Sequence, residues 1–128
     1  MAGQPVRYRQ AMIQFNPRDP TPSSSSPARF QPGQLVRHRR YGYRGVVAAL
    51  DLKCRADEQW YQSNKTQPGR DQPWYHVLVH GSHQTTYAAE SSLMPDRTGG
   101  EIAHPLVEEF FSEFVHGAYV RNSQPWPQ

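Results

Sequence analysis

The stretch RHRRYGYRGVV, residues 37–47, constrains the fold of this chain more than any other part of the sequence. It holds four arginines, two tyrosines and two glycines. Apolar β-type residues flank the charged part, with Leu35 and Val36 before it and Val46 and Val47 after it. This pattern predicts two short strands joined by a tight turn, with positive charge concentrated on the turn and its approach.

Further strand signals follow in order along the chain. Their apolar patterning predicts strands over residues 34–39, 45–51, 74–80 and 84–90, and a short one within 91–95. Residues 56–63 predict a short helical turn, and the polar residues 64–72 predict a loop. After His104-Pro105, apolar residues recur at helical spacing: Val107, Phe110, Phe111, Phe114 and Ala118. They predict a C-terminal helix, with Gly117 as its stop signal.

This order of elements, with short antiparallel connections, predicts a mainly β fold. We expect a small SH3-like barrel with a C-terminal helix. The 12 prolines, 9 glycines and low hydrophobic content of 36% favour such a barrel over a helical bundle. We expect residues 1–29, rich in serine and proline, to form a disordered arm. Residues 30–120 are then the domain and 121–128 a C-terminal tail.

The net charge of +3 is not spread over the domain. The arm carries Arg7, Arg9, Arg18 and Arg29 against Asp19, which accounts for the whole excess. Residues 30–128 hold ten basic and ten acidic side chains. An anion-binding face on this neutral domain must therefore come from local clustering of charge.

The cysteine count and the apolar runs bear on the compartment. Cys54 is the only cysteine, so an intramolecular disulfide is impossible and a reducing compartment is expected. No apolar run has the length of a membrane helix, and no signal-peptide pattern opens the sequence. The sequence predicts a cytoplasmic protein without a membrane partner.

The arginine cluster is the first candidate site. Arg37, Arg39, Arg40 and Arg44 share one hairpin, from which they would reach successive phosphates of a nucleic acid. Tyr43, or Tyr41, would then stack on a base or pack on a sugar. The alternative is that the arginines protect an edge strand while both tyrosines fill the core.

An aromatic patch is the second candidate. Trp60, Tyr61 and Trp74 would suit binding of a peptide or an unfolded protein client. The alternative is that these rings pack in the core of a small barrel.

Metal binding and catalysis have little support in the sequence. His80 and His83 flank a turn, but two ligands are too few for a closed metal site. Cys54 has no second thiol nearby, and no nucleophile motif is present. We therefore expect no enzyme activity, no cofactor and no metal.

The motifs resemble a known family. The stretch GQLVRHRRYGYRGVV, residues 33–47, resembles the opening of the hemimethylated-DNA-binding (YccV-like) domain family, which includes bacterial heat shock protein Q. The resemblance continues through DQPWYHVLV at 71–79, TYAAE at 86–90, LMPD at 93–96 and the His104-Pro105 pair. Together these motifs extend over the whole expected domain.

The resemblance implies an SH3-like barrel and two functions. The first is binding of double-stranded DNA methylated on one strand, in the context of replication control. The second is a role in protein degradation, as a recognition or specificity factor for an ATP-dependent Lon-type protease under heat stress. Similar domains also occur in F-box proteins. DNA binding is our leading interpretation and the protease factor is the alternative.

Overall fold

A computed structural model describes residues 28–127, so nearly all of the predicted arm 1–29 lies outside the described residues. The elements are β1 (Leu35–His38), β2 (Arg44–Asp51), α1 (Glu58–Ser63), β3 (Trp74–Val79), β4 (Thr85–Ala89), a 3₁₀ turn (Glu90–Ser92), β5 (Leu93–Pro95), α2 (Val107–Phe110), β6 (Phe111–Val115) and β7 (Ala118–Arg121). The mainly β class and the first five predicted strands are confirmed.

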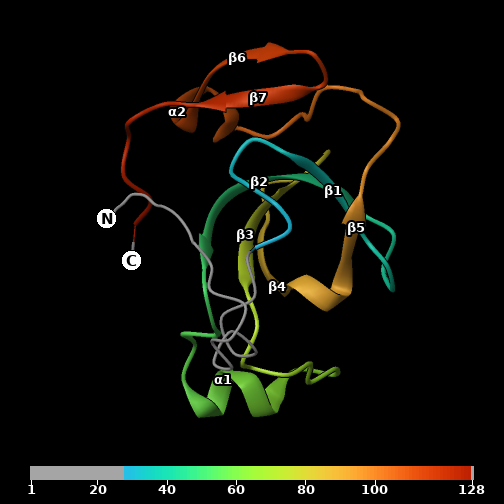
Figure 1. Cartoon of the computed structure of the whole chain (residues 1–128), viewed down its shortest axis with the longest axis vertical. Helices are drawn as coiled ribbons and strands as arrows, with labels where there is room; N and C mark the ends of the chain where they lie inside the picture. Colours follow the sequence, from blue (N-terminus) through green and yellow to red (C-terminus); the bar gives the residue numbers. More distant parts are fainter. Residues whose placement is uncertain (1–27, 128) are drawn as a thin grey trace, which may run out of the picture.

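The first five strands form one strongly curved antiparallel sheet in the order β4-β3-β2-β1-β5 (Figure 1). The helix α1 lies at one end of the molecule, and the hairpin β6–β7 lies across the other end. Within the described residues no ladder joins β4 to β5. A closed barrel is therefore not found, and both β4 and β5 are edge strands.

The predicted hairpin of β1 and β2 forms around a tight turn at Gly42. The His38 N–H donates to the Tyr43 carbonyl at 2.9 Å, and the Gly42 N–H donates to the His38 carbonyl at 2.9 Å. Gly42 has φ +76°, a left-handed conformation that glycine adopts without steric cost. The turn holds Arg39, Arg40 and Tyr41 at the surface.

The sheet is covered on both faces, as the apolar run of β2 predicts. On one face, Leu35, Val46, Ala48 and Leu78 pack against Ile102, Phe110, Phe111 and Tyr119 from the C-terminal part. On the other, Phe30, Val36, Val47, Tyr75, Val77, Ala88 and Leu93 form a second cluster. The pairing of β2 with β3 shifts register between Val47 and Ala49, which bends the strand through this two-sided core.

The C-terminal helix predicted between His104-Pro105 and a stop at Gly117 is wrong in its extent. The helix α2 is a single turn, Val107–Phe110, and Phe111 begins the strand β6. His116 and Gly117 have φ values of 54° and 78°, which fit a two-residue hairpin turn between β6 and β7. The aromatic residues that follow the helical spacing also suit strands, and tertiary packing decides between the two.

The hairpin β6–β7 docks on the turn that precedes β1. The Tyr119 N–H donates to the Gly33 carbonyl at 2.8 Å, and the Gly33 N–H donates to the Val47 carbonyl at 2.7 Å. Beyond β7, the Trp126 ring lies 5.0 Å from that of Phe110 and 5.3 Å from that of His76. The last described residues therefore contact the core; the domain boundaries themselves stay a prediction.

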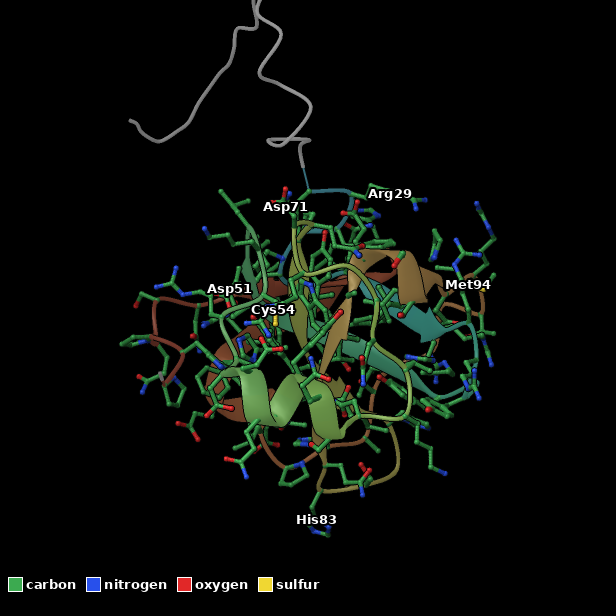
Figure 2. The ribbon with its side chains drawn as sticks, turned by 90° about the horizontal axis from the view of Figure 1, so that it is seen from below. Arg29, Asp51, Cys54, Asp71, His83 and Met94 are labelled. Atoms are coloured by element: carbon green, nitrogen blue, oxygen red, sulfur yellow. The ribbon has the colours of Figure 1, made fainter. Side chains whose placement is uncertain are left out.

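Two observations concern the predictions on metals and membranes. Among residues 28–127 no three His, Cys, Asp or Glu side chains come together to hold a metal, and no helix is long and apolar enough to cross a membrane. Figure 2 shows Cys54 inside the molecule and His83 at its edge. The His80 Nδ1 accepts the Ala103 N–H at 2.9 Å, so this histidine holds the segment of chain that leads to α2.

Candidate functional site

One buried carboxylate holds two of the four arginines in the β1–β2 hairpin. The side chain of Asp96 is 0% exposed; it accepts a hydrogen bond from Arg44 Nε at 2.8 Å and lies 3.5 Å from Arg37 Nη2. Burial opposes ionisation of Asp96, but hydrogen bonds from Arg44 and Thr98 outweigh it and hold the pKa of this carboxyl below its usual value. Arg37 and Arg44 therefore tie the hairpin to the end of β5.

The other two arginines, Arg39 and Arg40, are exposed on the turn. Among the described residues neither makes an ion pair with an acidic side chain. The Arg40 guanidinium lies 5.8 Å from the centre of the Tyr41 ring, and the Arg39 N–H donates to the Ser92 carbonyl at 2.8 Å. Two positive charges are thus presented to solvent by a backbone that is fixed at Ser92.

A stack of three rings lies behind these arginines. The His38 ring lies 4.7 Å from that of Tyr41, with an interplanar angle of 26°, and 5.0 Å from that of Tyr43. The His38 Nδ1 accepts the backbone N–H groups of Arg40 and Tyr41, each at 3.1 Å. Burial, and secondly the charge of Arg40, lower the pKa of His38. The imidazole is therefore neutral at pH 7 and carries its proton on Nε2.

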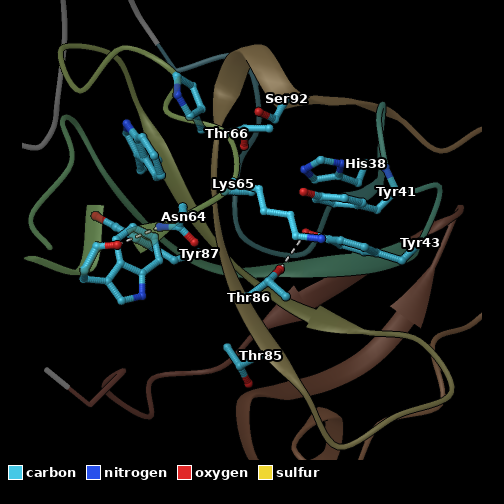
Figure 3. A pocket seen from close by; sticks show the side chains of 15 residues that line it. His38, Tyr41, Tyr43, Asn64, Lys65, Thr66, Thr85, Thr86, Tyr87 and Ser92 are labelled. Atoms are coloured by element: carbon cyan, nitrogen blue, oxygen red, sulfur yellow. Dashed lines mark hydrogen bonds between the residues drawn. The ribbon is translucent and has the colours of Figure 1, made fainter. Parts of the chain in front are cut away.

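The ring stack forms one wall of an open groove of about 370 Å³ (Figure 3). The edge strand β4 and the residues after it supply the floor, and the loop 64–68 crosses its side. The groove is lined by His38, Tyr41, Tyr43, Trp60, Asn64, Lys65, Thr66, Pro68, Trp74, Thr85, Thr86, Tyr87, Ala88, Ala89 and Ser92. The Tyr43 and Thr86 hydroxyls lie 2.7 Å apart in a hydrogen bond that joins the stack to β4.

The opposite wall is the aromatic patch that the sequence predicted, with one change of membership. The rings of Trp60, Trp74 and Tyr87 lie within 6.2 Å of each other, centre to centre. Trp60 is 37% exposed, whereas Trp74 is buried and donates from Nε1 to the Gly69 carbonyl. Trp60 and Trp74 are therefore parts of one wall, Trp60 as its exposed ring and Trp74 as its support.

Tyr61 does not line the groove. Its hydroxyl donates to the carbonyls of Gln67 and Pro68, at 3.0 and 2.8 Å, and Arg70 lies over its ring at 4.8 Å. Asp57 caps α1 by accepting the Trp60 N–H at 2.8 Å. Tyr61 and Asp57 therefore fix the helix and the loop that carry Trp60 and Lys65.

The sequence model of the family described as "Hemimethylated DNA-binding protein YccV like" matches residues 28–118, which is most of the chain. The chain belongs to this YccV-like family. The match covers the β1–β2 hairpin, the groove and most of the hairpin β6–β7. Membership of this family supports DNA binding, and the family is one of DNA-binding modules rather than of enzymes.

Curated relatives align with this chain over a small part of their own, much longer chains. F-box only protein 21 of Homo sapiens, of Pongo abelii and of Mus musculus is 34% identical over 95 residues in each case. The aligned part is 72% of this chain and 15% of each relative. The chain thus spans about a seventh of the length of the relatives it matches.

The structure of the YccV-like domain brings together residues that the sequence left apart. Tyr43 and the exposed Arg39 and Arg40 adjoin the same groove as Trp60, whereas Arg37 and Arg44 are held at Asp96. Sequence reasoning missed His38 and Lys65 as parts of a site. The pair His38 and Tyr41, three residues apart across a turn, was the available signal for the ring stack; nothing local placed Lys65 beside it.

Proposed function

We propose that this YccV-like domain binds double-stranded DNA and prefers duplex methylated on one strand. The face that does so carries Arg39 and Arg40 at the turn, with Tyr41 and Tyr43 behind them and Lys65 on the facing loop. Family membership supports the partner. The observation that carries the choice of residues is that Arg39 and Arg40 are exposed without an acidic partner among the described residues.

Local charge supports this assignment on a neutral domain. Of the residues that the structure describes, no acidic side chain lines the groove, whereas Lys65 does. Arginine and lysine side chains at such a surface contact phosphates and release condensed counterions, so binding weakens as salt is added. Arg37, whose side chain is 36% exposed, can add a phosphate contact only at the cost of weakening its 3.5 Å contact with Asp96.

The test is a salt titration of binding to matched unmethylated, hemimethylated and fully methylated duplexes. We expect affinity to fall steeply with salt and to be highest for the hemimethylated duplex. The double variant Arg39→Ala/Arg40→Ala should bind more weakly and flatten the dependence of log K on log salt by about two units, because each arginine that neutralises a phosphate adds about one unit to the slope.

The matched control is Lys53→Ala/Arg55→Ala. It removes the same charge from exposed positions that do not line the groove, so its salt dependence should stay close to that of the native domain. Equal slopes for both double variants would refute the assignment to Arg39 and Arg40. A flat titration with all duplexes, together with faster client proteolysis by a Lon-type protease, would favour the alternative role as a protease specificity factor.

Two finer points belong to the same proposal. We propose that the curved five-stranded sheet is an SH3-like barrel left open between β4 and β5, which its strand order supports.

We also propose a cytoplasmic location, because the one cysteine, Cys54, is free and buried. Recovery of the protein from a compartment other than the cytoplasm in cell fractionation would refute the location.

A further inference from the structure

We propose that the groove between the ring stack and the Trp60 wall holds an unstacked nucleobase, while Arg39, Arg40 and Lys65 hold the phosphates beside it. The inference deepens the proposed DNA binding and rests on it. The ligand proposed for the groove is a base that has turned out of the base stack. Contact with the outside of an intact duplex does not require such a base.

The walls of the groove suit a flat apolar ring. Tyr41 is 54% exposed and Trp60 37% exposed, although both belong to aromatic clusters. Their positions are fixed, because Tyr41 stacks on the buried His38, and Trp60 packs edge-on against Trp74 at 6.2 Å. Ordered, partly exposed aromatic faces are the platforms on which single-stranded nucleic acids stack their bases.

The size and the polar groups of the groove also suit a base. Its volume of about 370 Å³ falls in the range of small-ligand sites. His38, Ser92 and Thr85 are among its lining residues, and their side chains offer polar groups that can meet the edge of a base. A methyl group on such a base would add an apolar contact with the rings.

The charge around the groove selects among ligands with a flat ring. Lys65 reaches from the loop 64–68 toward the ring stack (Figure 3), and Arg39 and Arg40 lie on the turn between His38 and Tyr41. Within residues 28–127 no acidic side chain lines the groove, which disfavours a cationic ligand such as an alkylated ammonium group. A nucleotide presents a ring and an anion together at every unit, so it matches both features at once.

The experiment compares a single-stranded oligodeoxynucleotide with an abasic strand of the same length, which keeps the phosphates and lacks the bases. We expect the base-bearing strand to bind about tenfold more tightly and to quench tryptophan fluorescence, because stacking on one aromatic platform has that magnitude. Tyr41→Leu and Trp60→Leu should each reduce this preference, whereas Tyr41→Phe, which keeps the ring, should retain it. Both positions are exposed enough for the variants to fold.

Arg39→Ala/Arg40→Ala serves as the contrasting variant, because it should weaken binding of both strands alike. Equal binding of the two strands would overturn base capture and leave the groove to a protein partner. If the two strands bind equally but duplex binding remains salt-dependent, the proposed duplex binding stands and base capture is rejected. If the base-bearing strand is preferred while no duplex binds at any salt concentration, base capture stands and duplex binding fails.

Discussion

At the scale of single residues, the four arginines of the β1–β2 hairpin have two different roles. Arg44 lies against the fully buried Asp96 and is itself 16% exposed. Replacing Arg44 by Ala removes the closer cation from this buried carboxylate and leaves it Arg37 at 3.5 Å and Thr98, so we expect the free energy of unfolding to fall by about 2 kcal/mol. Arg39→Ala removes an exposed charge and should change it by less than about 0.5 kcal/mol. Urea denaturation of both variants measures the difference.

The critical result is which of the two variants, Arg44→Ala or Arg39→Ala, loses more stability. Similar stability for the two variants would show that Arg44 and Asp96 do not form a structural pair. DNA affinity should show the opposite order, with Arg39→Ala the more damaging of the two among folded molecules. A folded Arg44→Ala protein that loses more DNA affinity than Arg39→Ala would contradict the division of roles.

The sequence predicted the arginine cluster, but it did not show which arginines pair with an acidic residue and which are exposed. Alternation along β1 puts Arg37 and Arg39 on the same face, so the pattern treats them alike. Asp96 lies 52 residues after Arg44, and nothing near either residue signals their contact. The sequence therefore predicted where positive charge gathers, and only the fold separates the charges that are neutralised from those that are free.

At the scale of elements, the hairpin β6–β7 depends on a close backbone contact with the turn before β1. A Cβ atom on Gly33, which has φ +100°, would lie 2.0 Å from the Tyr119 carbonyl oxygen. Gly33→Ala must therefore push β7 away, and we expect it to lower the free energy of unfolding by roughly 3 kcal/mol. At Gly42, with φ +76°, a Cβ meets nothing within 4 Å. Gly42→Ala should cost about 1 kcal/mol from the left-handed backbone alone.

Urea denaturation, followed by fluorescence of Trp126 and the other tryptophans, compares the two glycine variants. Because both glycines have positive φ, the difference between the variants isolates the docking contact from backbone strain. An equal loss of stability in the two would mean that β7 does not need its contact with Gly33. We expect Gly33→Ala to disturb the packing of Trp126 as well, since β7 leads directly to it.

The hairpin β6–β7 also shows where pattern reading reaches its limit. Phe110, Phe111 and Phe114 fit one face of a helix, and Phe110 does lie at the end of the helical turn α2. The turn residues His116 and Gly117, followed by the strand formers of β7, were a competing hairpin signal. Local periodicity supports both readings, and the contact with Gly33, far earlier in the chain, favours the strands.

At the scale of the whole molecule, the groove exists only because distant segments meet. Its walls come from the β1–β2 turn and from α1 with β3 and β4, and the loop 64–68 completes it. The five strands were predicted from local patterns, and Tyr41, Tyr43, Trp60 and Trp74 were named as candidate contacts, whereas His38 and Tyr87 were not. The separation of the two groups of rings across the groove depends on the curvature of the sheet and the path of the loop, which arise from packing on both faces rather than from any single stretch of sequence.

The stability of the whole domain should depend on pH through two histidines, the buried His38 and the half-buried His76. Burial lowers the pKa of His38 and of His76 from the usual 6.5, although Asp51 partly opposes this at His76. The unfolded chain therefore takes up protons first, and the free energy of unfolding should decrease as the pH falls below about 6.5. Asp96, whose pKa is lowered from 3.8, keeps its contribution until far stronger acid.

Urea titrations between pH 7 and pH 5 test this origin of the pH dependence. The double variant His38→Asn/His76→Asn should flatten the decrease in stability, because asparagine still accepts hydrogen bonds but does not titrate. His83→Asn, at an exposed position, is the control and should retain the decrease. The explanation fails if the double variant loses stability over this range as steeply as the native domain.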